Sequence, residues 1–436
     1  MRSLSVFLVM LFLSGFVSCN KSDSTDNGID PFSNGGNERN IIVVISDLHL
    51  GADLQYAECK VNLGPLEKLL KQLKAAPNVK ELVIAGDLLD EWFVPATVNT
   101  YQGKDQADFV RRIATANKGV FDAMNSIIQE GKILVTYVPG NHDLTIAEAS
   151  VDLILPGINQ ARDQKLGLGT YSPVDYPKIA IEHSHRYNFF CAPDPISNQV
   201  IAPGTILPPG YFFTRIGALY VTQGRLSVGE KLPVVTQNIS GGESQDLLFR
   251  YWKTWEMAVK LFPIKNKFNE KIILANVDGF KGSYSVNDLA PYQSAPGGVI
   301  DVNLYNGIQD NWEARQTRNN VPIHITTAEA IDSVNSATYT DYLAKLQYFL
   351  NPNSDKRIVV FGHTHDPKIG APKNIDNNKC IYANSGTWID HNPGKTTMNF
   401  VVITPQSVDV SSQTLVKLYN FENEVMTKMA ENSMRY

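Results

Sequence analysis

The chain has 436 residues, of which 43% are hydrophobic and 19% are charged. This length and composition exclude an intrinsically disordered chain and allow one large globular domain or two ordinary ones. The formal net charge of -5 argues against polymeric nucleic acid as a partner, because proteins that bind it usually carry a basic surface.

The N-terminus has the pattern of a targeting segment. Arg2 is followed by an apolar run over residues 4–17 that is too short for a typical membrane span. Residues 13–19 are similar to the end of a bacterial lipoprotein signal, in which cleavage precedes Cys19 and lipid is attached to its sulfur. We therefore predict that residues 1–19 are a lipoprotein-type signal peptide ending at a lipidated Cys19. The alternative is ordinary signal cleavage nearby, which would leave a soluble secreted protein.

The predicted signal implies an exported protein, and we expect a periplasmic or cell-surface lipoprotein of a Gram-negative bacterium. Residues 20–40 are polar and show no apolar period, which predicts a flexible tether. The three further cysteines show neither CxxC nor zinc-knuckle spacing. One disulfide among them would be compatible with export, but three separate thiols are the favoured interpretation: Cys59, Cys191 and Cys380.

Residues 41–51, IIVVISDLHLG, predict a buried strand with a polar tip. The first five residues are all Ile or Val, which is typical of a strand buried on both faces. Asp47 and His49 follow just past its carboxyl end, where open α/β folds bind ligands. D-x-H alone is common in solvated loops. It indicates a ligand site here only because similar segments, each a strand followed by polar residues, occur later in the chain.

Three more apolar runs end in polar tips, and a fourth resembles them. Gly or another small residue beside most of these tips lets the backbone turn sharply or approach a ligand closely. The units are residues 81–92 (ELVIAGDLLDEW, with Asp87), residues 133–143 (ILVTYVPGNHD, with Asn141, His142 and Asp143), residues 357–366 (RIVVFGHTHD, with His363 and His365) and residues 178–185 (KIAIEHSH, with His183 and His185).

Helical periodicity separates the first three strands. Leucines recur at helical spacing over residues 64–76, and residues 105–130 carry a roughly continuous apolar helical face that ends before Gly131. The resulting order βαβαβ predicts a parallel sheet flanked by helices.

Between residues 186 and 352 the periodicity is irregular, with turn signals and aromatic-rich predicted helices over residues 247–262 and 327–350. We interpret residues 187–352 as an insertion or cap, and residues 41–186 and 353–436 as one core. An independent second domain is disfavoured because the chain returns to a core strand at Arg357. The strand-rich segments that follow predict a second, partly antiparallel sheet: residues 379–384, 398–403 and 414–419.

The residues at the strand tips offer oxygen and imidazole donors without a thiolate, a mixture that suits Mn, Fe, Zn or a similar divalent ion. The set is too large for one ion but fits two ions that share a bridge, for which the Asp87 carboxylate is the natural choice. Two such ions can hold a hydroxide and stabilise both the attacking and the leaving oxygen at phosphorus. The candidate metal ligands are Asp47, His49, Asp87, Asn141, His183, His363 and His365.

The ordered motifs DLH, GDLLD, GNHD, a lone His at a strand end and GHTH resemble the calcineurin-like metallophosphoesterase family, over about residues 41–185 and 357–403. The resemblance implies an α/β fold, a four-layer α/β/β/α sandwich of two mixed sheets, here with a large inserted cap region. It also implies metal-dependent hydrolysis of a phosphate ester or phosphoanhydride by a metal-bound hydroxide at a dinuclear centre.

A finer resemblance is to the branch containing the UDP-2,3-diacylglucosamine pyrophosphohydrolases. That branch usually has Arg where His142 stands, and its substrate is cytoplasmic, whereas this chain is predicted to be exported. We therefore carry over the scaffold and not the substrate.

Carried over by position, the resemblance implies two metal sites that share Asp87. His142 would be no ligand but a general acid or charge-stabilising donor near the leaving group, oriented by Asp143. One ion would be held by Asp47, His49, Asp87 and His365, and the other by Asp87, Asn141, His183 and His363.

The fifth unit departs from the family pattern, which usually has Gly where Ser184 follows His183. Strand alternation would point His183 and His185 the same way, so spacing leaves the choice of ligand open. We favour His183 because it follows the apolar run more directly. Candidate substrate contacts are Trp92, His185 and His391, while Asp90 is interpreted as a helix-start residue that accepts bonds from backbone amides.

The expected partner is a small phosphorylated substrate, with membrane contact only through the lipid anchor. A binding or scaffold protein that kept the fold and lost catalysis is the main rival, but such proteins typically lack a ligand or the GNHD histidine, and this chain has all of them. A nucleotide or sugar-nucleotide pyrophosphatase stays open as well, because monoester, diester and pyrophosphate substrates share the same metal core.

Overall fold

A computed structural model describes residues 30–163, 166–334, 336–408 and 411–435. The predicted signal peptide and the first half of the predicted tether therefore lie outside the described residues. From Asp30 onward the chain is packed and not a tether. The Phe32 side chain is buried with its ring 5.7 Å from that of Phe400, and the Asn40 N–H donates to the Asn78 carbonyl. The tether prediction is wrong for residues 30–40, because one aromatic side chain within a polar stretch is enough to fix it on the core.

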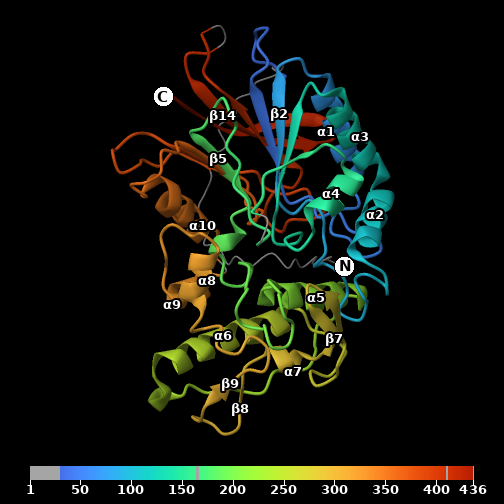
Figure 1. Ribbon diagram of the computed structural model, residues 1–436, viewed down its shortest axis with the longest axis vertical. Helices are drawn as coiled ribbons and strands as arrows, with labels where there is room; N and C mark the ends of the chain where they lie inside the picture. The colour runs from blue at the N-terminus through green and yellow to red at the C-terminus, as the bar shows by residue number, and fades with distance from the viewer. Residues whose placement is uncertain (1–29, 164–165, 335, 409–410, 436) are drawn as a thin grey trace.

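A seven-stranded mixed sheet forms the centre of the molecule (Figure 1). Its four parallel strands are joined on the β1 side by three antiparallel strands from the C-terminus. In spatial order the strands are β15 (Val425–Met434), β14 (Thr414–Glu422), β13 (Asn399–Thr404), β1 (Ile41–Ile45), β2 (Val79–Ala85), β3 (Leu134–Val138) and β4 (Asn159–Gln160).

A second sheet of four strands packs face to face against the first. In it β5, β10 and β12 run parallel, and β11 closes one edge in the antiparallel direction. The order is β11 (Lys368–Gly370), β12 (Ile381–Asn384), β10 (Ile358–Phe361) and β5 (Ile179–Glu182).

The prediction that the last strands build the second sheet is correct only for β12. Strands β13 and β14 belong to the first sheet, where β13 pairs with β1, and β15 was not predicted. Val402 of β13 faces the helical side of that sheet while Val401 and Ile403 face the second sheet. Strand composition shows that β13 is buried on both faces but does not specify which strand is its neighbour.

Helices cover the outer face of the first sheet, at the right of Figure 1. Ile41, Val43 and Ile45 of β1 pack toward these helices, whereas Ile42 and Val44 pack between the two sheets. The predicted strand buried on both faces is thus confirmed. The covering helices are α1 (Leu63–Ala75), α2 (Gln106–Ala116), α3 (Lys118–Glu130) and α4 (Glu148–Ile154).

Residues 105–130 form two helices and not one. The break is at Asn117, whose buried side-chain amide donates to the carbonyls of Gly51 and Ile113. Asn is favoured at such boundaries because its side chain competes for backbone hydrogen bonds. The contact with Gly51 also connects this break to the loop that follows β1.

The outer face of the second sheet is covered by α10 (Ala337–Ala344) and the π-helical turn η3 (Lys345–Phe349). Phe349 is buried in the same cluster as Val359 and Phe361 of β10, and the Tyr348 ring lies 6.1 Å from that of Phe361. The four-layer α/β/β/α arrangement of two mixed sheets is therefore confirmed, with the fourth layer supplied by the end of the inserted region.

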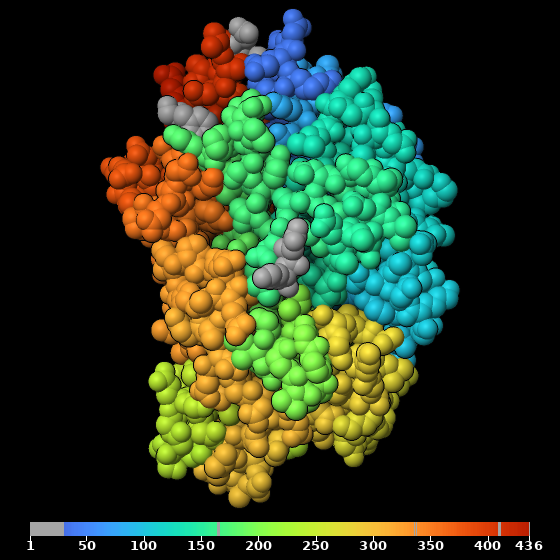
Figure 2. Space-filling model, in the orientation of Figure 1, coloured from blue at the N-terminus to red at the C-terminus, as the bar shows by residue number. Residues whose placement is uncertain are grey.

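We call residues 187–352 the cap; Figure 1 shows most of it below the two sheets, and Figure 2 shows its green to light-orange residues as the lower half of that face. Its aromatic residues pack inside it, as in the stacked pair Phe213 and Trp255, with ring centroids 3.9 Å apart. Its main elements are α5 (Pro209–Thr222), α6 (Gly242–Leu261), the hairpin β6 (Ile273–Val277) and β7 (Phe280–Tyr284), α7 (Val286–Leu289), β8 (Tyr292–Gln293), β9 (Ile300–Asp301), α8 (Trp312–Arg318) and α9 (Thr327–Asp332).

A buried arginine joins the cap to the core. The Arg215 guanidinium on α5 donates to the carbonyls of Val94 and Val98 in the core loop and of Leu274 in β6.

No described helix combines the length and the apolar character needed to cross a membrane. The structure contains Cys59, Cys191 and Cys380 as separate buried thiols.

Candidate metal centre

The polar tips of the strands meet at one edge of the two sheets, and most of them have an unusual backbone. A left-handed conformation at a residue other than Gly costs about 1–3 kcal/mol and is concentrated at functional sites. Backbone hydrogen bonds from Asp47 to Gly86 and from His49 to Asp87 hold two of these tips together. The left-handed residues of this edge are Asp47 (φ 54°), His49 (φ 47°), Asp87 (φ 51°), Ser184 (φ 81°), His363 (φ 71°) and His365 (φ 53°).

Asp47, His49 and His365 form the first group of donors. The His365 Nε2 atom lies 3.0 Å from Asp47 Oδ1 and 3.2 Å from His49 Nε2. The His49 Nε2 atom is also 3.6 Å from Asp87 Oδ2. All three side chains are buried, so these atoms face one another and not the solvent.

Asp47, Asp87 and His183 form the second group, with Asn141 beside them. The His183 Nε2 atom lies 3.1 Å from Asp87 Oδ2 and 3.1 Å from Asn141 Oδ1. The His183 Nδ1–H donates to the Ala85 carbonyl at 2.9 Å, which directs Nε2 toward the carboxylates. Asp47 thus belongs to both groups, whereas Asp87, the predicted bridge, belongs to the second and lies beside the first.

His363 completes the set on the side of β10. The backbone N–H of His363 donates to both Asp47 carboxylate oxygens at 3.1 Å, and the centroid of its ring lies 5.1 Å from that of the His183 ring. Burial, together with the neighbouring His183, lowers the pKa of His363 to about 3, so its imidazole is neutral. The seven residues predicted as ligands are therefore gathered at one place.

Two glycines allow these groups to approach so closely. A Cβ atom at Gly86 would lie 2.4 Å from the His183 ring, and one at Gly140 would lie 2.1 Å from Asp87 Oδ1. The Gly before Asp87 and the Gly of the GNHD motif are thus required by the space around the donors.

The choice between His183 and His185 is resolved by the backbone of Ser184. Its left-handed conformation, which Gly adopts more readily, ends β5 and begins a 3-10 turn, so strand alternation does not extend to His185. Both ring nitrogens of His185 lack a hydrogen-bond partner among the described residues, and burial holds its pKa well below the usual range. Only His183 reaches the donor groups.

His142 lies beside the first group, but the predicted partner is wrong. Its Nδ1 atom is 2.8 Å from Asp90 Oδ1, and the other Asp90 oxygen is 3.1 Å from His49 Nδ1. Asp143 instead accepts backbone amides from Gly140, Leu88 and Leu89, and so joins the β2 and β3 tips. An adjacent carboxylate in sequence suggested an orienting role, yet the two side chains point to different sides of the loop.

Asp90 accepts the backbone amides of Trp92 and Phe93, as predicted, but the predicted helix start is wrong because the next helix along the chain begins only at Gln106, and the contacts of Asp90 with two histidines were missed. Glu58 was missed as well: its Oε2 atom is 3.5 Å from His49 Nδ1, and burial raises its pKa to about 7. The repeated acid in GDLLD was an available signal for Asp90, whereas no motif points to Glu58.

The electrostatics of the centre favour cations. Among the described residues, the buried carboxylates of Asp47, Asp87 and Asp90 form ion pairs with histidines and not with Lys or Arg. Although burial lowers the pKa of a histidine, these carboxylates outweigh that effect and raise the pKa of His49 to about 10 and of His183 to about 9. A buried place that stabilises positive charge and offers clustered O and N donors fits divalent metal ions.

A cleft leads from this centre into the cap. Trp92 lines it and stacks on His142, with ring centroids 5.1 Å apart. His185 and the exposed His391, the other predicted contacts, are not among the described residues that line it.

Comparison with known proteins agrees with this geometry. No curated protein matches the sequence. A solved structure of vacuolar protein sorting 29 from Cryptosporidium parvum is similar to the chain, at 11% identity over 91% of this chain and 98% of that one, with a TM-score of 0.29. Residues 41–226 match the profile of the calcineurin-like phosphoesterases. These residues contain four of the five polar tips, so this part of the chain is similar to the calcineurin-like phosphoesterases.

Proposed function

We propose that the protein is a metal-dependent phosphoesterase that hydrolyses a small phosphorylated substrate at a centre of two divalent ions. The observation that carries the proposal is the convergence of buried donors from five strand ends beside His142, at the mouth of a cleft. Manganese, iron and zinc all suit carboxylate, amide and imidazole donors.

In this proposal one ion would be held by Asp47, His49, Asp87 and His365. The carboxylates of Asp87 and Asp47 would also face the second ion. That second ion is held by His183, Asn141 and His363. When bound, the ions would supply Lewis acidity for the phosphate oxygens and for the attacking water. The left-handed tips keep the donors in place, so the chain itself fixes where the phosphate binds.

His142 has the chemistry of a proton donor to the leaving oxygen. Asp90 occupies its Nδ1, so Nε2 is the nitrogen available to a substrate in the cleft that His142 lines. Burial lowers the pKa of His142, but the charges of Asp90 and Asp87 outweigh this and raise it above the ordinary value. The direction of this shift favours the protonated ring that a proton donor to the leaving oxygen requires.

The binding-protein alternative is weaker because it gives no reason for the Asp90–His142 pair. A scaffold that merely kept its ions would need the ligands but not a non-ligand histidine held by a buried carboxylate at the cleft. The present donors serve a monoester, a diester or a pyrophosphate equally, so the proposal does not extend to the bond type.

We also propose that the protein is exported and membrane-anchored through Cys19. The support is the sequence alone, namely Arg2, the apolar run over residues 4–17 and the Cys that ends it. Replacing Cys19 with Ala should abolish metabolic labelling with a radioactive fatty acid, and persistent labelling would contradict the anchor.

The catalytic proposal is tested with the full chain, manganese and the chromogenic esters p-nitrophenyl phosphate and bis(p-nitrophenyl) phosphate. Hydrolysis that requires manganese and is lost in Asp87→Asn supports it. Asp122→Asn, an exposed carboxylate on α3, is the matched control and should keep full activity. Metal binding without hydrolysis of either ester would favour the binding protein.

A further inference from the structure

The cap side of the cleft is apolar although the catalytic side is charged. Its wall is made by side chains of α5, α6 and α10 and of the segments that follow α6 and α9, which we call the apolar arm: Phe213, Ala258, Leu261, Phe262, Val334 and Leu343. From this we infer that the substrate is a phosphate ester of a large apolar alcohol, whose hydrocarbon part lies in the apolar arm. The inference rests on the proposed function and adds the substrate class.

The apolar arm is buried and yet lines open space. Phe213, Phe262 and Leu343 are at most 9% exposed, but each borders the cleft. An apolar wall without atoms against it loses dispersion contacts, and water gains few hydrogen bonds there. A hydrocarbon group supplies those contacts, which is why an apolar occupant is favoured over water or a sugar.

Three of the hydroxyl groups in this part of the cleft are already hydrogen-bonded within the protein, while Ser336, Tyr339 and Thr340 line it as well. Thr214, Thr254 and Ser333 line the cleft, but each hydroxyl donates to the carbonyl of the residue four positions earlier in its own helix or helix end. Their hydrogen-bonding capacity is therefore largely used within the protein, so they recognise a hydroxylated ligand poorly.

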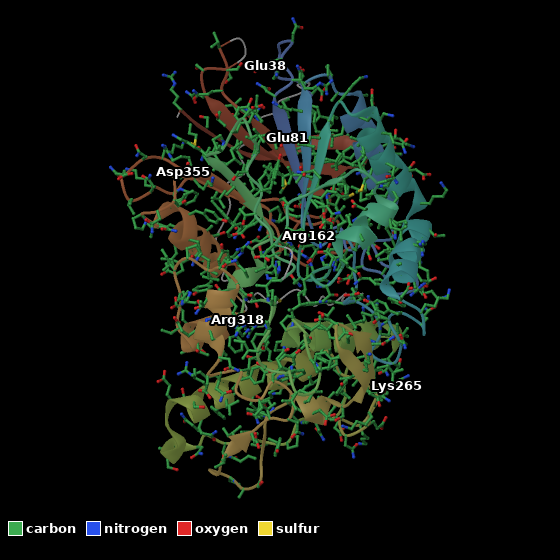
Figure 3. All side chains as sticks on the ribbon, viewed as in Figure 1. Glu38, Glu81, Arg162, Lys265, Arg318 and Asp355 are labelled. Carbon is green, nitrogen blue, oxygen red and sulfur yellow. The ribbon has the colours of Figure 1, made fainter. Side chains whose placement is uncertain are left out.

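The charges that a nucleotide would need are absent from the lining. Among the described residues that border the cleft there is no Lys or Arg, and the acids Glu58 and Asp87 are at the metal centre. Lys265 and Arg318, two basic residues of the cap that are labelled in Figure 3, are exposed and are not among the described residues that line the cleft. A second phosphate in the apolar arm would lose its hydration without gaining a cation, which disfavours sugar nucleotides.

The apolar lining begins beside the proposed proton donor. Trp92 stacks on His142 and belongs to the same hydrophobic cluster as Phe213 and Leu343. The group that leaves with the proton of His142 is thus the one that faces the apolar arm. In the reaction, water adds to phosphorus, the P–O bond to the apolar alcohol breaks, and that oxygen takes a proton, giving phosphate and the free alcohol.

The test compares octyl phosphate with butyl phosphate and adenosine monophosphate, using the full chain loaded with manganese and octyl phosphate below its micelle concentration. Phosphate release gives KM and kcat, and calorimetry gives the binding constant independently of turnover. We expect octyl phosphate to have a KM and a dissociation constant about 10-fold or more below those of butyl phosphate, because four additional methylene groups leave water. Adenosine monophosphate should bind more weakly than octyl phosphate.

Ala258→Phe is designed to fill the apolar arm and Lys260→Phe is its matched control. Lys260 is exposed on the same helix, so its replacement adds the same ring outside the cleft. The first variant should lose the preference for octyl over butyl phosphate while keeping bound manganese, and the control should keep both the preference and the rate of hydrolysis.

The two proposals fail in different ways. Equal binding of octyl and butyl phosphate, or stronger binding of adenosine monophosphate, overturns the substrate class even if hydrolysis is fast. Strong binding of octyl phosphate with no release of phosphate supports the substrate class and contradicts the catalytic proposal. If Ala258→Phe does not fold, the comparison of the three ligands on the unmodified chain still decides the question.

Discussion

The two ends of the cleft are built on opposite principles. At the sheet edge, charged side chains are buried together and the backbone is strained. In the apolar arm the side chains are hydrocarbon and most of them lie on helices, and the neighbouring hydroxyls of Thr214 and Thr254 bond within their own helices. The difference suggests that reactivity and selectivity are carried by separate regions, so that a substitution in one should leave the property of the other intact.

The largest effect is expected for Asp47→Asn, because Asp47 belongs to both donor groups. Removing its charge should lower metal-dependent hydrolysis by roughly 10³-fold or more. Metal content measured by mass spectrometry should fall from two ions per chain, while the relative binding of octyl and butyl phosphate is unchanged. Retention of both ions with full activity would contradict the assignment.

His142→Ala should have the next largest effect. Hydrolysis should slow by roughly 10²–10³-fold because the leaving oxygen loses its proton donor, whereas the ions stay bound. Steady-state kinetics with an ester of a good leaving group should recover part of the loss, since such a group needs no proton. An equal loss for good and poor leaving groups would indicate a role in positioning only.

Glu91→Gln probes a buried carboxyl between the two regions that touches no predicted metal ligand. Burial, only partly offset by hydrogen bonds from Thr145 and Tyr101, raises the pKa of Glu91 to about 7. A raised carboxyl pKa in the folded chain means that stability falls as pH rises from the unfolded value of about 4.5 to 7. The variant should therefore be more stable than the parent by about 2 kcal/mol at pH 8, with little difference at pH 4.

Urea unfolding at the two pH values measures this change in the free energy of unfolding. The difference between variant and parent isolates Glu91 from the histidines of the metal centre, whose titration is common to both. A difference that does not depend on pH would show that Glu91 is ionised in the folded chain without penalty.

The smallest expected effect is the difference in folding stability between the variants Gly86→Ala and Gly204→Ala. Both glycines have left-handed backbone (φ 89° and 83°), but a Cβ at Gly86 meets the His183 ring whereas one at Gly204 meets nothing within 4 Å. Gly204→Ala in the cap should cost about 1 kcal/mol of stability from backbone strain alone. Gly86→Ala should cost about 1 kcal/mol more and also weaken metal binding, as seen by urea unfolding and a manganese titration; equal losses would mean that His183 moves freely.

The sequence was most informative where the chemistry is local. Each polar tip follows its own strand within a few residues, so the donors could be predicted without knowing which strands are neighbours. The partners of His142 could not, because Asp90 and Asp143 are equally plausible in sequence and only the loop geometry separates them. The inserted region was predicted to form one wall of the cleft, but the residues of the apolar arm were not predicted, since they come from three helices and two further segments with no common motif.

Strand neighbours and local backbone conformation are the other features that could not be predicted from the sequence. Strand β13 shows its burial in its composition but not its neighbour β1. Spacing alone did not separate His183 from His185, although His183 was favoured, because the conformation of Ser184 could not be predicted. The packing of Phe32 against Phe400 joins residues far apart in the chain, and a polar stretch gives no sign of it.

The left-handed tips also determine how the protein should tolerate the loss of its ions. Their strain is already borne by the folded backbone, held by hydrogen bonds such as that from His49 to Asp87. Because the donor groups are already ordered before an ion binds, little of the binding free energy is lost in ordering them, and the affinity for the ion is higher. A chain treated with a chelator should accordingly keep the geometry of its donor groups and be reactivated by added manganese without refolding.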